Sequence, residues 1–450
     1  MANTSLTRTF DQVGNRTTWT LSVWIKRTGI GGQQNFFGSF PQSTDYERIM
    51  FNNDKIYIAE VAGGSTNWEC ETDAVYRDVT SWYHLVLRHD TTQSTANDRI
   101  RLYINGVQQT FGTNSQPAQN RGTAINTADV HKIGMGNSSE YTDCIMSHFH
   151  WCDGQSYAPT VFGSTDATTG EWKINTSPTV SYGTNGFFIL KDGNSVTDQG
   201  GGSHNWTVAS GTLSKTEDCP SNVFATLNVL NQNTTNAITF EKGSNTIATA
   251  ASATMFHGSS TLGMPQNSGK FYAEFKWTSG SYPIAGVTSR ARNDARESGG
   301  KRPGGENGSY GFEMYNGGVK VNSSTIGGFS GSSLTTNDIL CIAIDCENSK
   351  IYFRKNGDAW MNSGDPTSGS TGTGAISLTA ASGGDNDGFW FFVNGDGDAS
   401  SSSLIACNFG NGSFNGTAVS SAGTNASNNG EFEYDVPAGY TALSTKGLNL

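Results

Sequence analysis

Hydrophobic and polar residues alternate along many short stretches of this chain. Residues 19–26, 99–104, 271–277 and 340–345 each place apolar side chains at every second position. A period of two is typical of a β-strand with one face on a core. The run at 389–393, FWFFV, lacks polar partners and predicts a strand buried on both faces. No stretch of ten or more residues has a convincing helical pattern, so we expect an all-β protein.

Two Asn-Gly pairs predict tight turns at corresponding places in the two halves. Asn105-Gly106 follows RIRLYI, and Asn356-Gly357 follows KIYFRK. Asn-Gly after an alternating run favours a type I′ hairpin turn, because both central residues of that turn need positive φ. The chain has 56 glycines without a three-residue period, and we interpret them as turn residues between strands.

A polar stretch containing Pro220 divides the chain into halves of similar length. We predict a first sandwich over 1–212, a connector over 213–236 with a short anchored piece at 223–227, and a second sandwich over 237–450. Each half is long enough to bury its own core. The expected fold is therefore two tandem antiparallel jelly-roll β-sandwiches.

Composition and charge exclude several functional classes. Charged residues make up 15% of the chain and the net charge is −11, which disfavours nucleic-acid binding through displaced counterions. No apolar run reaches about 18 residues, so we expect no membrane insertion. The first eight residues show no export signal, and the seven cysteines lack a C-x-x-C pair. We therefore expect reduced thiols that pack as small apolar residues.

Three groups of residues are candidates for binding. A basic cluster could dock an acidic partner, although a solvated loop is the simpler interpretation. Its members are Arg290, Arg292, Arg296, Lys301 and Arg302. Three tryptophans in turn-like surroundings, Trp68, Trp206 and Trp360, could stack on sugars or belong to the core. Asn394, Asp396 and Asp398 place oxygen ligands at alternate positions and could wrap Ca²⁺, with an acidic turn as the alternative. We expect no other cofactor.

Several segments resemble known families. The first half resembles a concanavalin A-like, laminin-G-type jelly roll in residues 18–27, 81–90, 99–108 and 131–136. The second half resembles a SPRY domain in residues 270–277, 308–322, 338–360 and 362–374. Residues 148–172 and 436–450 resemble closing segments of marine bacteriophage virion proteins. These motifs specify the fold better than the function.

The resemblance implies a non-enzymatic phage surface protein, such as a tail appendage or fibre tip. It would bind a host surface glycan or receptor through sandwich loops. The alternative is a capsid decoration or tail component that binds only other virion proteins. Either protein would assemble in the host cytoplasm and form a homo-oligomer, with a trimer favoured.

Two further clusters bear on catalysis and metal binding. Glu69, Glu71 and Asp73 share one strand face, as in the Glu-x-Asp-x-Glu run of concanavalin A-like glucanases, but the central Asp is missing. A glycan hydrolase is thus a third alternative. His148, His150 and Cys152 offer zinc ligand types, yet successive same-face positions of a strand lie too far apart, so we expect packing.

Overall fold

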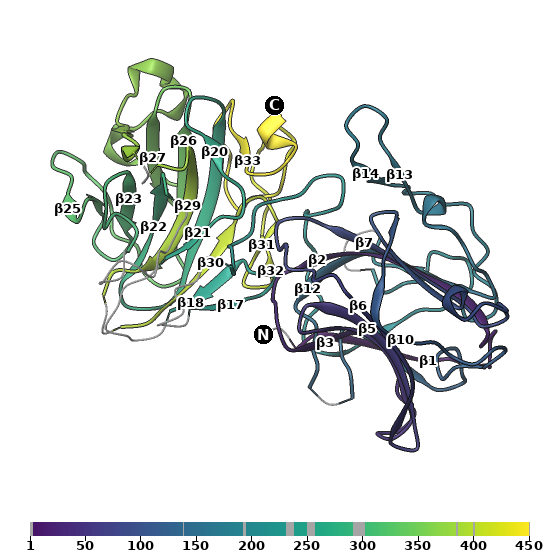
Figure 1. Cartoon of the computed structure of the whole chain (residues 1–450). Coiled ribbons are helices and arrows are strands. Elements are labelled where there is room, and N and C mark those ends of the chain that lie inside the picture. Colours follow the sequence, from purple (N-terminus) through teal and green to yellow (C-terminus); the bar gives the residue numbers. More distant parts are fainter. Residues whose placement is uncertain are drawn as a thin grey trace. The chain divides into compact units, whose positions relative to one another are not determined.

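The computed structural model divides into two compact units, 1–213 and 214–450 (Figure 1). It describes residues 3–137, 139–191, 195–230, 238–249, 257–290, 302–383, 386–398 and 401–449. Within these ranges the regular secondary structure consists almost entirely of antiparallel strands, and each unit contains two large sheets. The all-β prediction of tandem jelly-roll sandwiches is confirmed.

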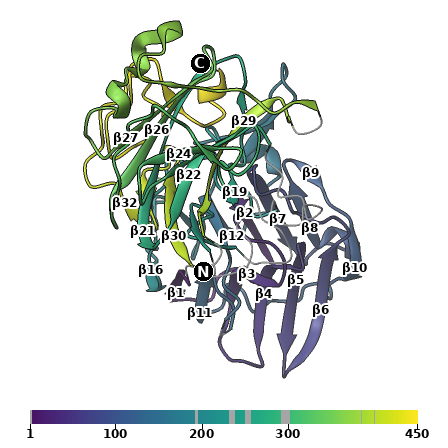
Figure 2. The same ribbon diagram turned by 90° about the vertical axis from the view of Figure 1, so that its left-hand side faces the viewer.

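The first unit packs an eight-stranded sheet, sheet 1, against a six-stranded sheet, sheet 2, counted over the described residues. In spatial order, sheet 1 contains β10 (Phe111–Ser115), β6 (Ser65–Thr72), β5 (Lys55–Ala62), β4 (Tyr46–Asn52), β3 (Gln33–Ser39), β11 (Val130–Ile133), β1 (Ser5–Thr9) and β16 (Thr207–Ser210). Figure 2 shows β3, β4, β5, β6 and β10 side by side. Sheet 2 contains β15 (Phe187–Ile189), β12 (Cys144–Asp153), β2 (Thr18–Arg27), β7 (Tyr83–Asp90), β8 (Ile100–Ile104) and β9 (Val107–Gln108). A separate hairpin consists of β13 (Gly163–Thr165) and β14 (Trp172–Ile174).

The second unit is also a sandwich of two sheets over the described residues. Sheet 3 contains β17 (Thr239–Glu241), β18 (Thr246–Ala248), β30 (Ser403–Asn408), β21 (Lys270–Gly280), β26 (Ile339–Asp345), β27 (Lys350–Lys355) and β28 (Ile376–Ser377), with β33 (Thr441–Ala442) parallel to β21. Sheet 4 contains β19 (His257–Ser259), β29 (Phe389–Asp396), β22 (Pro283–Thr288), β23 (Ser309–Glu313), β24 (Gly318–Val321) and β25 (Ser324–Thr325), with β20 (Met264–Pro265) beside β29. A small hairpin consists of β31 (Ser413–Phe414) and β32 (Thr417–Ala418).

In the described part of the chain, the helical pieces are single 3₁₀ turns or short 3₁₀ segments outside the strands. They are η1 (Ala96–Asp98), η2 (Pro159–Val161), η3 (Met361–Ser363), η4 (Pro366–Thr371) and η6 (Gly447–Asn449). No helix in the described ranges is long and apolar enough to cross a membrane.

The alternation of side chains explains both cores. In β2, Leu21, Val23 and Ile25 point between the two sheets of the first unit and are fully buried. In β21, Phe271 and Phe275 do the same in the second unit. The opposite positions of each strand point to an outer sheet face. The four sheets differ in what covers this outer face.

The outer face of sheet 2 is covered by the chain between β12 and β15. The ring of Trp172 lies where a Cβ on Gly106 or Gly163 would be, so these two glycines permit its close approach. Its indole N–H donates to His84 Nδ1 at 2.9 Å. Burial lowers the pKa of His84 to about 3, so the imidazole is neutral. Because Nδ1 accepts this bond, Nε2 carries the proton and donates to Ser22 Oγ. His84 therefore cannot act as a general base that activates the Ser22 hydroxyl.

The outer face of sheet 3 is covered by the C-terminal segment. Glu274 on β21 points to this face and is fully buried. Its carboxylate accepts four hydrogen bonds, from Tyr272 OH, Asn408 Nδ2 and the backbone N–H groups of Glu433 and Tyr434. Burial raises the pKa of Glu274 to about 7, while these donors oppose that rise. The four bonds anchor residues 433–434 over the sheet.

Residues 302–308 cover the outer face of sheet 4 at β22 and β23. Gly286 and Gly311 are paired across β22 and β23, which leaves a smooth surface there. A Cβ at Gly311 would overlap the carbonyl oxygen of Pro303. Arg302 fixes the segment by donating to the Gly397 carbonyl at 2.7 Å and lying 3.9 Å from the buried Glu313.

Two local predictions are wrong. Phe389 is 45% exposed, so the strand at 389–393 is not buried on both faces at its first residue.

Asn105 and Gly106 have φ of 48° and 78°, as the type I′ prediction requires. Asn356 has φ of 50°, but Gly357 does not have positive φ, and the next strand, β28, begins only at Ile376. That pair therefore forms no hairpin.

The expected connector contributes to the second unit where it is described. Phe224, Ala225 and Leu227 are buried in the clusters of that unit. Ala225 N–H donates to the Leu443 carbonyl at 2.9 Å, and Phe224 forms an isolated bridge with Ser444. Residues 231–237 lie outside the described ranges.

The close approach over sheet 4 leads to a stability prediction. Gly311→Ala should lower the free energy of unfolding by about 1–3 kcal/mol, because the new methyl group overlaps the Pro303 carbonyl. Gly327→Ala is the control, since a Cβ there meets no atom within 4 Å and its effect should stay within about 0.5 kcal/mol. Equal urea midpoints for the two variants would contradict the proposed contact.

Candidate functional site

The outer face of sheet 1 differs from the other three because half-buried polar and aromatic side chains line it. The central strands β4, β5 and β6 all contribute. Pairing between these strands and with β11 places these side chains on one face: Tyr46, Arg48, Asn52, Lys55, Tyr57, Glu69, Glu71 and Lys132. We call these eight residues the sheet 1 platform.

Arg48 forms the centre of the platform. Its guanidinium carbon lies 5.3 Å from the ring centroid of Tyr46 and 5.6 Å from that of Tyr57. Its Nη1 lies 3.4 Å from Oε1 of Glu140, a residue in the loop before β12. The two rings and the carboxylate hold the long side chain in one conformation, so a ligand meets a preformed surface.

The two glutamates of β6 are held by neighbouring strands. Tyr57 OH donates to Glu69 Oε2 at 2.6 Å. Burial and this bond to Glu69 raise the pKa of Tyr57, so the phenol keeps its proton. Glu71 accepts from Asn52 Nδ2 at 2.9 Å and lies 3.7 Å from Lys55 Nζ. The platform thus presents fixed acceptors on β6 beside donors on β4 and β5.

Asp73 does not join these glutamates. The strand β6 ends at Thr72, so Asp73 lies beyond it. Its carboxylate lies at the position that a Cβ on Gly112 would occupy, beside β10. The pattern of three carboxylates on one strand face is therefore broken, and the resemblance to the glucanase run stops at two residues.

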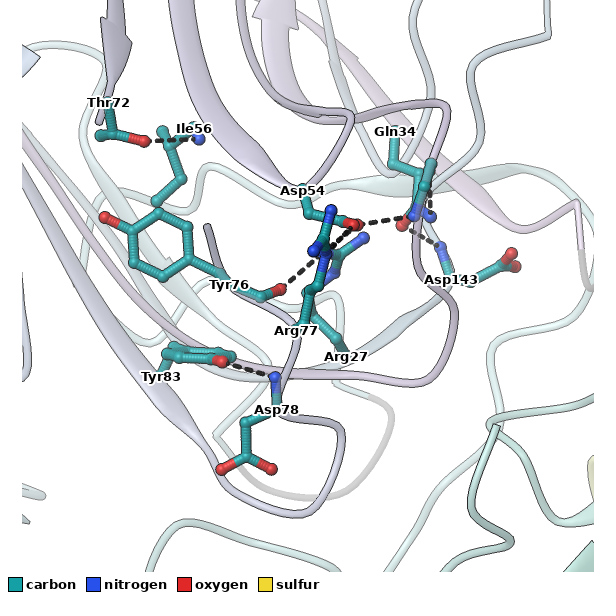
Figure 3. Close-up of polar contacts among 11 residues, drawn as sticks. Arg27, Gln34, Asp54, Ile56, Thr72, Tyr76, Arg77, Asp78, Tyr83 and Asp143 are labelled. Atoms are coloured by element: carbon teal, nitrogen blue, oxygen red, sulfur yellow. Dashed lines mark hydrogen bonds and ion pairs between the residues drawn. The ribbon is translucent and has the colours of Figure 1, made fainter. Parts of the chain in front are cut away.

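Loops at one end of the first sandwich meet at Asp54. Figure 3 shows the Asp54 carboxylate between Arg27 and Arg77. Its Oδ1 accepts from Arg27 Nη1 at 2.8 Å and from Gly31 N–H at 2.6 Å, and its Oδ2 accepts from Arg77 Nε at 2.8 Å. Burial opposes ionisation, but these donors lower the pKa of Asp54 below its usual value. One carboxylate therefore fixes the loops that carry Gly31 and Arg77.

A pair of carboxylates lies inside the same sandwich. Glu47 and Glu60 face each other across β4 and β5, and both are buried. Glu47 Oε2 accepts from Ile125 N–H at 2.8 Å, while Arg121 Nε lies 2.8 Å from Glu60 Oε2. Burial is the main cause that raises the pKa of Glu47 to about 8, and Glu60 adds to it. The pair anchors residues 121–125 over the sandwich end.

The predicted basic cluster is not a free patch where it is described. Arg290 is only 8% exposed, and Arg302 is engaged with Gly397 and Glu313. Arg290 is therefore too buried to form an exposed contact, and a partner-binding role for the half-buried Arg302 stays a prediction. Arg292, Arg296 and Lys301 lie outside the described residues.

Two of the three tryptophans cannot form a sugar platform. Trp68 and Trp206 are 1% and 3% exposed and belong to the first core, which is one of the two alternatives that the sequence left open. Trp360 is half-buried, with the Arg354 guanidinium 4.8 Å from its ring centroid. A binding role for Trp360 stays a prediction.

Two of the three predicted calcium ligands, Asn394 and Asp396, are buried and already hydrogen-bonded within the protein. Asn394 is fully buried, and its amide nitrogen donates to Cys407 Sγ at 3.2 Å. Asp396 accepts from Asp398 N–H at 2.8 Å and from Ser401 Oγ at 3.0 Å, as in a tight acidic turn. This geometry contradicts a shared cation site that includes Asn394, because its side chain is part of the core.

The histidine and cysteine residues of β12 pack against the sheet and its cover. His150 stacks on Phe188 at 3.9 Å, and its Nδ1 lies 2.9 Å from Tyr182 OH. Cys152 is buried with Val86 and Phe162. Among the described residues, no group of three or more His, Cys, Asp or Glu side chains could hold a metal ion.

Sequence reasoning missed the sheet 1 platform. The alternation in YERIMFN and KIYIAEV would have placed Tyr46, Arg48 and Tyr57 on one face. The turn residues Asn53 and Asp54 have positive φ, and their position between these runs was the available hairpin signal. Contacts between strands, such as that of Tyr57 with Glu69, could not be derived without the register.

Comparisons with known proteins agree with the two sandwiches. Residues 2–161 match the family model of the concanavalin A-like lectin/glucanases superfamily, of laminin-G type, and residues 270–373 match the SPRY domain model. The chain therefore contains a concanavalin A-like domain followed by a SPRY domain. Such folds are usually binding modules for carbohydrate or protein.

Similar solved structures each cover part of the chain. The SPRY domain of human HERC1 is 14% identical and covers 38% of this chain and 91% of its own, with a TM-score of 0.25. A SAP-like pentraxin from Limulus polyphemus is 13% identical and covers 42% and 89%, with a TM-score of 0.27. Domain 4 of the arabinanase AbnA from Geobacillus stearothermophilus, in complex with arabinotriose, is 12% identical and covers 32% and 65%, with a TM-score of 0.25. No curated protein matches the chain.

Removing the charge of Asp54 should destabilise the first unit. Asp54→Asn leaves the fully buried Arg27 without its counter-charge, so we expect a loss of about 3 kcal/mol in the free energy of unfolding. Arg77 is 58% exposed, and Arg77→Ala should cost less than about 1 kcal/mol. Urea unfolding followed by tryptophan fluorescence measures both. Equal losses would contradict the distinction between the two ion pairs.

The stability of the first unit should depend on pH through Glu47. Because its pKa is raised from an ordinary 4.5 to about 8, its contribution is fully present below pH 4.5 and is lost as pH rises to 8. Glu47→Gln keeps an acceptor for Ile125 N–H and removes the titration. Relative to this variant, the wild type should lose up to about 4 kcal/mol between pH 5 and pH 9.

Urea midpoints of both proteins across this pH range provide the measurement. The exposed Glu171→Gln is the matched control, because it removes one carboxylate from the hairpin over sheet 2. Its difference from the wild type should stay constant with pH. Parallel curves for the wild type and Glu47→Gln would show that Glu47 ionises normally.

Proposed function

We propose that this protein is a non-enzymatic binding protein that recognises a glycan through the sheet 1 platform of its concanavalin A-like domain. The observation that carries the proposal is the difference among the outer sheet faces. Folded chain covers those of sheets 2 and 3 and the β22–β23 part of sheet 4, whereas sheet 1 presents half-buried tyrosines and polar groups.

The chemistry of the platform suits sugar hydroxyl groups. A hydroxyl both donates and accepts, and the platform offers carboxylate acceptors at Glu69 and Glu71 beside donors at Asn52 and Arg48. These side chains are already held by neighbours, so little rotamer freedom is lost on binding. The ring edges of Tyr46 and Tyr57 add apolar contact next to the polar groups.

The present partners of the platform glutamates favour binding over hydrolysis at this face. Glu69 is hydrogen-bonded to Tyr57, Glu71 to Asn52 and Lys55, and Asp73 lies beside β10. Retaining hydrolysis needs an acid and a nucleophile about 5–5.5 Å apart, and each platform glutamate already has another partner.

The biological setting we propose is the surface of a phage virion. Its support is the sequence resemblance of residues 148–172 and 436–450 to closing segments of phage proteins. In the first unit, residues 148–172 lead to the Trp172 anchor that covers sheet 2. The SPRY domain would then attach the protein to other virion components, and the assembled protein would be a homotrimer.

Binding to immobilised glycans tests the function. The wild type should bind at least one oligosaccharide, and the double variant Arg48→Ala, Tyr57→Ala should weaken that binding at least tenfold, because it removes the centre of the platform. Glu171→Gln, on the hairpin over sheet 2, should bind as the wild type does. A thermal unfolding curve for each variant controls for folding.

Absence of binding across envelope glycans and storage polysaccharides would reject the proposal. It would leave the alternative in which the protein binds only other virion proteins. Release of reducing ends from a bound glycan would instead contradict the non-enzymatic assignment.

A further inference from the structure

The charges of the sheet 1 platform are balanced within its own surface. Three cations lie on the face or beside it, at Arg48, Lys55 and Lys132. Three carboxylates accompany them, at Glu69, Glu71 and Glu140. The described residues of β10, β3, β1 and β16 add no further charge to this face.

Each cation is already engaged. Arg48 lies between two tyrosine rings and next to Glu140, and Lys55 lies 3.7 Å from Glu71. Lys132 Nζ donates to the Gly136 carbonyl at 3.2 Å and lies 5.3 Å from the Phe40 ring centroid. An acidic sugar would have to take one of these cations from its present partners.

The β6 side of the platform is less favourable still to an anion. Glu69 and Glu71 are two residues apart on one strand face, and Lys55 is the cation beside them. Glu69 uses Oε2 for Tyr57 OH, which leaves its half-buried carboxylate able to accept a further hydroxyl. The whole chain carries −11, which repels polyanions at long range.

We propose that the platform selects uncharged glycans and rejects acidic ones, with Glu69 as the acceptor for a sugar hydroxyl. This inference rests on the proposed glycan-binding function and adds the chemical class of the ligand. The physical basis is that a neutral hydroxyl gains a charge-assisted hydrogen bond at Glu69, whereas a uronate or sulfate group meets a carboxylate there.

The experiment compares neutral and acidic oligosaccharides of equal length. The neutral probes are malto-, cello-, laminari- and mannohexaose, and the acidic probes are hexamers of galacturonate and alginate. Isothermal titration at 50 and 500 mM NaCl should show at least tenfold tighter binding of one neutral hexaose than of either acidic hexamer. Its affinity should change less than twofold with salt, since no net charge is neutralised.

Variants that neutralise or reverse the charge of the β6 glutamates provide a second test. Glu69→Gln should weaken binding of the neutral hexaose at least fivefold, because a carboxylate acceptor becomes a neutral amide. Glu69→Lys with Glu71→Lys should abolish that binding and create salt-sensitive affinity for the acidic hexamers. Glu171→Gln should change neither, and circular dichroism should show that every variant is folded.

The outcomes separate this inference from the proposed function. Tighter, salt-sensitive binding of an acidic hexamer by the wild type would overturn the selectivity but keep the glycan-binding function. Unchanged neutral binding in Glu69→Gln would overturn the role of Glu69. Failure to bind any probe, neutral or acidic, would overturn both proposals.

Discussion

Each strand of a β-sandwich has one face toward the core and one outer face. In this protein the four sheets differ in what covers the outer face. Alternating side chains fill one core between the two sheets of each unit, but the other half of each strand still needs an environment. In sheets 2 and 3, and at β22 and β23 of sheet 4, folded chain segments cover the outer side. In sheet 1, polar and aromatic side chains contact one another and remain partly open to solvent.

The covered faces depend on a few close contacts rather than on large apolar areas. Trp172 lies directly against Gly106 and Gly163, and Pro303 lies against Gly311. Over sheet 3, four donors converge on the carboxylate of Glu274. A buried carboxylate is costly unless its oxygens are satisfied, so each such group specifies one position of the segment that supplies the donors.

Much of the architecture follows from the sequence because the strand pattern is regular. The alternation at 19–26 and 271–277 identifies the core strands β2 and β21, and Asn105-Gly106 identifies a hairpin. Asn356 bonds back to Ile339 in the same way as Asn105 bonds back to His84, so the asparagine contacts do not distinguish the two turns. The Asn356-Gly357 prediction failed because the chain continues from this turn into η3 and η4 and reaches the next strand, β28, only at Ile376. A dipeptide signal describes local preference, but the partner strand decides whether a hairpin forms.

The candidate site was harder to predict because its members come from strands that meet only after folding. Trp68 was a candidate by residue type, yet its position on β6 points it into the core, whereas the adjacent Glu69 points outward. A shift of one residue in strand phase exchanges these two faces. Register therefore determines which residues of β6 can meet a ligand, and it makes an ordered row of donors and acceptors from residues that are far apart in sequence.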